Sequence, residues 1–195
     1  MAPRLILASA SPRRKALLEG LGLPFEVIPS GIPEDGDEGP AAEQAPALAL
    51  AKARDVAVRV EKGLVLGADT IVECEGQALG KPADAAEARA MLGALSGRTH
   101  QVVTGVALVD TASGRAETAA AVTDVTFREL SEAEITAYAE TGEPFGKAGA
   151  YGIQGLGGLF VEGIRGSPSN VIGLPITLVA DLLRRFGLDL WHLRR

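Results

Sequence analysis

The chain of 195 residues is 47% hydrophobic and 23% charged, a composition typical of a folded globular protein with a sizeable core and not of a disordered chain. It carries 25 Asp and Glu residues against 19 Lys and Arg, a net charge of -6, which argues against a duplex-binding surface but not against a small anion bound by a few focused cations. The single cysteine, Cys74, excludes an intramolecular disulfide and has no nearby Cys or His partner for a zinc site, so we expect a buried thiol in a strand.

The first apolar run, residues 5–7, is too short for a signal peptide or a membrane span, so we expect a cytoplasmic protein with no membrane partner. The final residues, 190–195, are expected to form a frayed tail with a basic end. The length predicts one domain over residues 1–195, or two tightly joined lobes.

The first strand and helix predict an anion site. Residues 5–8 are expected to form a strand, and the following helix opens at Pro12, behind the N-cap Ser11, and ends near Gly20 or Gly22. Free backbone N–H groups and the helix dipole meet the Ser9 hydroxyl there, together with three cations, Arg13, Arg14 and Lys15. Because successive residues leave a helix about 100° apart, only one or two of the cations can point at one ligand. The alternative is a surface helix that happens to begin with basic residues.

The polar stretch 30–40 supplies carboxylates after a second expected strand at residues 25–29. Mg²⁺ takes one or two carboxylates together with water and substrate oxygens, so Glu34 is a candidate metal ligand. A solvated acidic loop is the preferred interpretation of Asp35, Asp37 and Glu38.

A long Ala-rich helix is predicted over residues 41–62. Lys52 lies within its apolar portion, where a lysine usually extends its amine to solvent; the alternative is that it reaches into a cleft.

The apolar run at residues 64–72 predicts a buried central strand, and Asp69 lies inside it. A buried acid is costly unless it is paired or chemically active. One interpretation is that Asp69 caps a local turn, since Gly67 before it indicates a bend; the other is a catalytic carboxylate.

The rest of the chain predicts a mixed α/β sheet. Glu75-Gly76 is expected to form a hairpin turn. Capping-box pairs, Asp84 with Glu87 and Ser131 with Glu134, predict helices that end near Gly97 and Gly142. The other elements expected are strands at residues 102–109, 119–127 and 159–164, a turn at 166–170, and a last helix from Pro175 to Phe186.

The glycine-rich segment 146–158 matches neither the phosphate-loop pattern nor G-x-G-x-x-G. Its glycines permit close backbone approach to a ligand, with Lys147 and Gln154 able to address charge and a base edge.

Several of these segments together resemble the Maf (septum formation protein) family of nucleoside triphosphate pyrophosphatases. They are Ala8-Ser9-Ala10-Ser11-Pro12-Arg13-Arg14, Gly67-Ala68-Asp69-Thr70, Gly80-Lys81-Pro82, Ser96-Gly97-Arg98-Thr99-His100, Lys147-Ala148-Gly149-Ala150-Tyr151-Gly152-Ile153-Gln154-Gly155 and Gly173-Leu174-Pro175. The resemblance implies an α/β fold of the Maf and inosine-triphosphatase type, with a mixed twisted sheet, flanking helices and two lobes around a cleft. It also implies hydrolysis between the α and β phosphates, a divalent metal cation such as Mg²⁺ or Mn²⁺, and a homodimer.

The resemblance also implies roles for single residues. Asp69 matches the family's proposed proton acceptor, and Arg13, Thr70 and Gln154 match positions that distinguish its subgroups, here the subgroup acting on dTTP and UTP. The cations expected to offset phosphate charge are Arg13, Arg14, Lys52, Lys81 and Lys147, and the metal ligands expected are Glu34 and Asp69. Two departures are Pro33, where an acid is frequent, and Pro168, where an aromatic is frequent.

Two other hypotheses remain open. One is the same chemistry on a modified purine triphosphate such as 7-methyl-GTP, and the other is a non-catalytic nucleotide-binding regulator of septation. A nucleic-acid-binding module fits least, because the chain is acidic and poor in aromatics.

Overall fold

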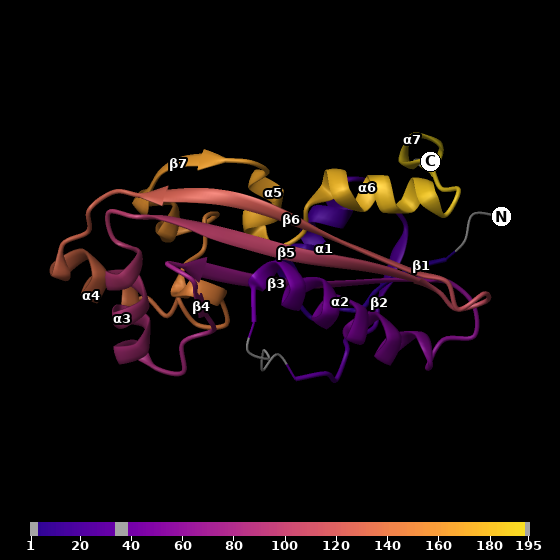
Figure 1. Ribbon diagram of the computed structural model, residues 1–195, viewed down its shortest axis with the longest axis horizontal. Coiled ribbons are helices and arrows are strands. Elements are labelled where there is room, and N and C mark those ends of the chain that lie inside the picture. The colour runs from indigo at the N-terminus through magenta and orange to yellow at the C-terminus, as the bar shows by residue number, and fades with distance from the viewer. Residues whose placement is uncertain (1–3, 34–38, 194–195) are drawn as a thin grey trace. The chain divides into compact units, whose positions relative to one another are not determined.

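The computed structural model describes residues 4–33 and 39–193 and contains a mixed sheet of seven strands within those ranges (Figure 1). The strands are β1 (Leu5–Leu7), β2 (Phe25–Val27), β3 (Leu64–Cys74), β4 (Gln77–Leu79), β5 (Thr99–Asp110), β6 (Ala116–Phe127) and β7 (Val161–Arg165). Their order is β2-β1-β3-β5-β6-β7, with β4 paired to β3. β1 is parallel to β2 and β3, whereas β3–β4 and β6–β7 are antiparallel, which confirms the prediction of a mixed sheet.

The helices of the described residues flank this sheet. They are α1 (Pro12–Gly20), α2 (Ala41–Ala57), α3 (Ala85–Leu95), α4 (Glu132–Glu140), the 3-10 turns η1 (Ala148–Ala150) and η2 (Leu156–Phe160), α5 (Pro168–Ile172), α6 (Ile176–Arg185) and α7 (Leu190–Leu193). None of them is both long and apolar enough to span a membrane.

The chain forms two compact units. The first unit holds the described residues up to Asp69, Thr104–Ala121 and the residues from Gly173 onward; the second unit holds Thr70–Val103 and Val122–Ile172. The single domain over residues 1–195 stays a prediction.

In the first unit β1 and the start of β3 are buried on both faces. Leu7 and Leu66 pack in one apolar cluster with residues of α1 and α6, while Ile6 and Val65 pack in another with α2. A strand covered on both faces has no solvent side for polar residues, which is why these segments read as unbroken apolar runs.

Helix α2 packs close to the sheet. Ala45, Ala49 and Ala53 recur every four residues along it and are fully buried. A Cβ added to Gly67 would lie 2.1 Å from the backbone oxygen of Ala49, and one added to Gly105 would lie 2.1 Å from the backbone carbon of Ala45. The prediction that Gly67 marks a bend is therefore wrong: it lies within continuous β3, and its missing side chain makes room for the helix backbone.

We expect Gly67→Ala to lower the free energy of unfolding by about 3 kcal/mol or more, because the new methyl group meets backbone atoms that cannot turn away. Urea unfolding followed by circular dichroism measures this change. The matched control is Gly20→Ala in α1, where an added Cβ meets nothing within 4 Å and the change should be about 1 kcal/mol at most. Equal unfolding energies for the two variants would contradict the close packing of α2.

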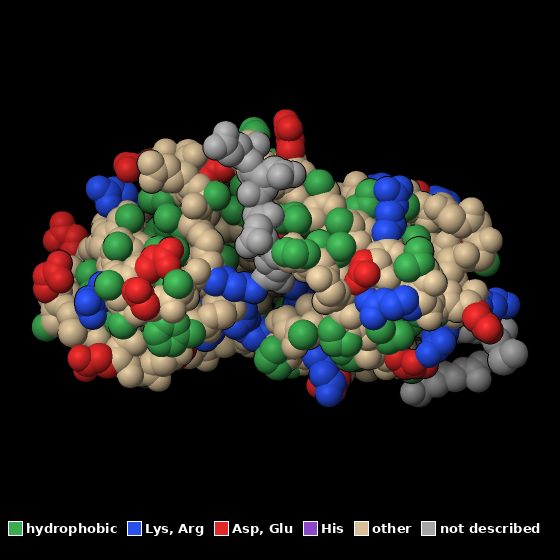
Figure 2. All heavy atoms as spheres, turned by 90° about the horizontal axis from the view of Figure 1, so that it is seen from below, with side chains coloured by type: hydrophobic (Ala, Val, Ile, Leu, Met, Phe, Trp, Pro, Cys, Tyr) green, Lys and Arg blue, Asp and Glu red, His purple; other side chains and the backbone are tan. Residues whose placement is uncertain are grey.

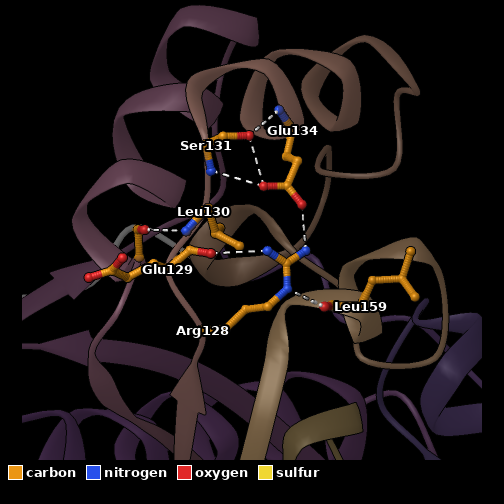
Figure 3. Close-up of polar contacts among 7 residues, drawn as sticks. Arg128, Glu129, Leu130, Ser131, Glu134 and Leu159 are labelled. Atoms are coloured by element: carbon orange, nitrogen blue, oxygen red, sulfur yellow. Dashed lines mark hydrogen bonds and ion pairs between the residues drawn. The ribbon is translucent and has the colours of Figure 1, made fainter.

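The second unit packs α3 and α4 around an apolar cluster that includes Leu92, Val102 and Phe127. The predicted helix starts are confirmed. The Asp84 carboxylate accepts from the Glu87 backbone N–H at 2.8 Å, and Ser131 with Glu134 forms a complete capping box (Figure 3).

Arg128 extends this capping box. Its guanidinium donates to the Glu134 carboxylate at 2.6 Å and to the Leu159 carbonyl at 3.0 Å, as Figure 3 shows. The Arg128 hydrogen bond, followed by those from Ser131, lowers the pKa of Glu134 to about 2. The start of α4 is thereby connected to η2.

Several predicted boundaries and element types are wrong. The helix expected over 41–62 ends at Ala57, because the residues that follow turn the chain back into β3. Residues 156–160 form η2, so the strand expected from 159 begins at Val161.

Residues 168–172 form α5 where a turn was expected. The buried Asn170 amide holds this helix, because it donates to the Val102 carbonyl and the Thr123 hydroxyl at 2.9 Å each. The expected frayed tail contains α7, whose start is capped by the Asp189 carboxylate accepting from the Trp191 N–H at 3.0 Å.

Candidate functional site

The residues predicted to form an anion site lie at the β1–α1 turn of the first unit. Pairing of β1 with β3 continues past Leu7, since the Ala8 N–H donates to the Leu66 carbonyl at 2.8 Å. Ser9 follows at that end of β1, and the Asp69 carboxylate follows Leu66 along β3. Ser11 caps α1 as predicted, accepting from the Arg14 N–H, with Pro12 at the first helical position. Parallel pairing thus places the serine and the acid beyond the same end of β1.

Arg14 is the cation that α1 directs into the protein. It is 8% exposed; its Nε donates to the Gly173 carbonyl at 2.8 Å and a terminal nitrogen donates to the Ser9 hydroxyl at 3.2 Å. Burial lowers the pKa of Arg14 to about 10, against the opposing effect of Asp69, so the group stays charged at neutral pH.

The neighbouring cations take other directions. Arg13 is partly buried, and burial lowers its pKa, whereas exposed Lys15 forms an ion pair with Glu19 at 3.5 Å. Lys15 therefore lies exposed on α1 and pairs within that helix, whereas Arg14 is buried.

Asp69 and Lys52 form a buried ion pair. The Lys52 Nζ lies 2.6 Å from Asp69 Oδ1, and the two side chains are 5% and 7% exposed. Burial lowers the pKa of Lys52, opposed by the attraction and the hydrogen bond of Asp69. The interpretation of Lys52 as a lysine extending to solvent is wrong. The Asp69 side chain accepts a hydrogen bond from Lys52, whereas one interpretation of the sequence had it capping a local turn.

The first unit therefore collects two buried cations, one buried carboxylate and a serine hydroxyl beside a helix N-terminus. Buried cations beside a helix N-terminus are suited to binding an anion, and the carboxylate paired with Lys52 lies in the same unit. This is the part of the predicted site that the structure brings together.

The other predicted residues belong to the second unit or lie outside the described ranges. Thr70 directly follows Asp69 along β3 and is half-buried, Lys81 and Gln154 are exposed, and the partly buried Lys147 donates from Nζ to the Glu143 carbonyl. Glu34, the second predicted metal ligand, lies outside the described residues, as do Asp35, Asp37 and Glu38. Within residues 4–33 and 39–193, no three Asp, Glu, His or Cys side chains are grouped as a metal site would require.

Sequence reasoning assigned no role to His100 and Tyr151, which meet in the second unit. The His100 Nε2 lies 2.9 Å from the Tyr151 hydroxyl, and both rings contact Phe127 edge-to-face. Burial lowers the pKa of His100 to about 4, so the imidazole is neutral at pH 7, and burial raises the pKa of Tyr151. This contact anchors the glycine-rich segment between Lys147 and Gln154.

Glu143 is a third residue without a predicted role. Its carboxylate accepts from the backbone N–H groups of Leu156 and Gly157 at 2.9 and 3.1 Å. The signal in the sequence is its position three residues before the glycine-rich segment.

Comparison with known proteins decides the family. The Maf-like protein family matches residues 4–186, almost the whole chain. The chain belongs to this family. Among curated relatives of this Maf-like protein is the "dTTP/UTP pyrophosphatase" of Moorella thermoacetica, 56% identical over 189 residues, which cover 96% of this chain and 97% of the relative. Another, of the same name, is that of Deinococcus radiodurans, 49% identical over 188 residues, covering 96% and 95%.

Among solved structures, the Maf-like chain is similar to the nucleoside-triphosphatase / dITP/XTP pyrophosphatase of Mycobacterium abscessus. That likeness has 19% identity and a TM-score of 0.42, and it covers 64% of this chain and 72% of the other. It is too distant to carry an argument about the Maf-like protein's substrate.

Proposed function

We propose that this Maf-like protein hydrolyses dTTP and UTP between the α and β phosphates, releasing the nucleoside monophosphate and pyrophosphate. The observation that carries the proposal is the buried group of Asp69, Lys52 and Arg14 beside the N-terminus of α1. The printed names of relatives at 49–56% identity over nearly the full chain support the substrate class.

The chain's own residues supply two functions that this hydrolysis needs. Water attacks the α phosphorus, the bond to the bridging oxygen breaks, and the proton of the water passes to a base. Asp69 is the base in this proposal: Lys52 holds its Oδ1, and its second oxygen is assigned to the water. Arg14, and Arg13 beside it, offset the negative charge of the phosphate oxygens.

A divalent cation is part of the proposal. The donor set supports it, because Asp69 offers a hard carboxylate oxygen and Mg²⁺ needs only one or two carboxylates when substrate oxygens complete its shell. Glu34 is the second ligand proposed from the sequence. When bound, the ion would polarise the phosphoryl group and stabilise developing charge.

Selection of the nucleobase is assigned to the second unit. Gln154 is exposed and its amide offers both a donor and an acceptor, as a pyrimidine edge requires. A glutamate there would only accept and would suit the donor edge of guanine better. Thr70 and Arg13 are the other proposed specificity positions, and Lys81 and Lys147 are proposed phosphate contacts.

Other expectations also stay proposals. We place the reaction in the cytoplasm because its substrates are nucleoside triphosphates, and the homodimer rests on the family resemblance. The absence of a nucleic-acid partner rests on the net charge; both signs of charge lie on the face that Figure 2 shows, so that face is not uniformly basic.

The test measures pyrophosphate release with Mg²⁺ or Mn²⁺ from dTTP, UTP, CTP, dITP, GTP and 7-methyl-GTP. We expect dTTP and UTP to give the largest kcat/KM. A preference for 7-methyl-GTP or dITP would replace the pyrimidine assignment with a modified purine, while binding without release from any nucleotide would favour the non-catalytic regulator of septation.

A further inference from the structure

The segment that carries Gln154 is fixed from one side by α4 and the residues after it, all within the second unit. The Tyr138 hydroxyl accepts from the Gly152 N–H at 3.2 Å, two residues before Gln154. The Glu143 carboxylate accepts from Leu156 and Gly157, two and three residues after it. Gln154 is therefore an exposed residue within a short segment that is bound at both ends.

The two anchoring groups also bind each other. The Tyr138 hydroxyl donates to Glu143 Oε1 at 2.9 Å, and the buried Tyr138 ring packs edge-to-face on Phe160 with centroids 4.9 Å apart. Thr141 fixes the backbone between them, because its hydroxyl donates to the Tyr138 carbonyl at 2.7 Å and accepts from the Glu143 N–H at 3.1 Å. Tyr138, Thr141 and Glu143 therefore form one hydrogen-bonded network at the end of α4.

Close packing shows how tightly the segment lies against these groups. A Cβ at Gly155 would lie 2.5 Å from both Glu143 carboxylate oxygens, and one at Gly157 would lie 2.7 Å from the Tyr138 hydroxyl. Glycines let the backbone approach to hydrogen-bonding distance. Burial raises the pKa of Glu143, but the bonds from Gly157, Leu156 and Tyr138 outweigh it, so the net direction is downward and the group is ionised at neutral pH.

Glu143 also connects this segment to the proposed phosphate contact Lys147. The Lys147 amine donates to the Glu143 carbonyl, and the carboxylate attracts it electrostatically. A Cβ at Gly152 would lie 2.9 Å from the Lys147 side chain, so the lysine stem packs against the same segment.

We propose that Glu143 is a positioning residue for base selection: together with the Tyr138 hydroxyl, its carboxylate fixes residues 152–157 so that Gln154 is presented in one orientation to the pyrimidine. The inference rests on the proposed function, because it assigns Gln154 to the base. Discrimination by hydrogen bonding requires a fixed donor and acceptor, and a mobile segment would let Gln154 accommodate other bases.

The test uses Glu143→Gln, which keeps the shape but places an NH₂ group where an oxygen accepted an N–H. We expect KM for UTP to rise roughly tenfold and the ratio of kcat/KM for UTP over CTP to fall by a similar factor, the effect of about one lost hydrogen bond, while kcat changes less than about threefold. Hydrogen exchange of peptides spanning residues 152–157 should become faster. Tyr138→Phe should act in the same direction.

The control is Glu140→Gln, which changes an exposed carboxylate three residues earlier at the end of α4 and should leave the ratio and the exchange unchanged. If the ratio of kcat/KM for UTP over CTP is unchanged in Glu143→Gln, whether both nucleotides lose activity in equal proportion or neither loses any, the positioning role is overturned and the proposed function stands. If the wild-type protein releases no pyrophosphate from any nucleotide, the proposed function is overturned and the inference fails with it.

Discussion

Asp69→Asn is expected to lower kcat for pyrophosphate release from dTTP by roughly 10²- to 10⁴-fold, the usual contribution of a general base. Asparagine keeps the shape of the side chain but cannot accept the proton of the attacking water or give a metal a charged ligand. Because the substitution also removes the counter-charge of buried Lys52, the rate must be measured at a temperature where circular dichroism shows the variant folded.

Asp181→Asn is the matched control. Asp181 lies on α6 in the same unit, is exposed, and pairs only locally with Arg184 at 2.6 Å. Its rate should equal that of the wild type. Turnover by folded Asp69→Asn within about threefold of wild type would contradict the role of Asp69, whichever nucleotide proves to be the substrate.

Lys52→Met is expected to have the largest effect on stability, lowering the free energy of unfolding by about 3–5 kcal/mol. The substitution leaves the Asp69 carboxylate buried without the amine that now lies 2.6 Å from it. A buried charge that loses its partner costs more than the pair contributed, because desolvation is no longer offset. Urea unfolding at pH 7, followed by circular dichroism, measures the change.

Lys15→Met removes the same side chain from an exposed pair with Glu19 and should change stability by no more than about 0.5 kcal/mol. The double variant Lys52→Met/Asp69→Leu should regain part of the loss, because two apolar groups replace the buried pair, while buried Arg14 loses the attraction of Asp69. The interpretation fails if Lys52→Met costs no more than Lys15→Met, or if the double variant is less stable than the single one.

The helix starts illustrate how far local sequence reaches. Ser11, Asp84 and Ser131 all cap helices where the pattern predicts, because each accepts from a backbone N–H three residues along. The errors lie where a distant group decides. η2 forms in place of a strand beginning at residue 159, and the Glu143 carboxylate, 13 and 14 residues before Leu156 and Gly157, holds their N–H groups at the start of that turn.

The candidate site divides in the same way. The sequence could single out Asp69 and Lys52 as charges in apolar surroundings, and a resemblance covering most of the chain could name their family. It could not pair the two side chains, which are 17 residues apart on different elements, nor distinguish Arg14 from Lys15.

By itself, then, the sequence determined the mixed sheet, the helix caps, the buried strands and the family, because these depend on short-range periodicity, local hydrogen bonds and motifs. Tertiary structure alone decided that Gly67 admits the α2 backbone, that Lys52 neutralises Asp69, and that Glu143 holds the segment around Gln154. These contacts join residues from different elements, and their energy depends on distances and burial that exist only once the chain has packed.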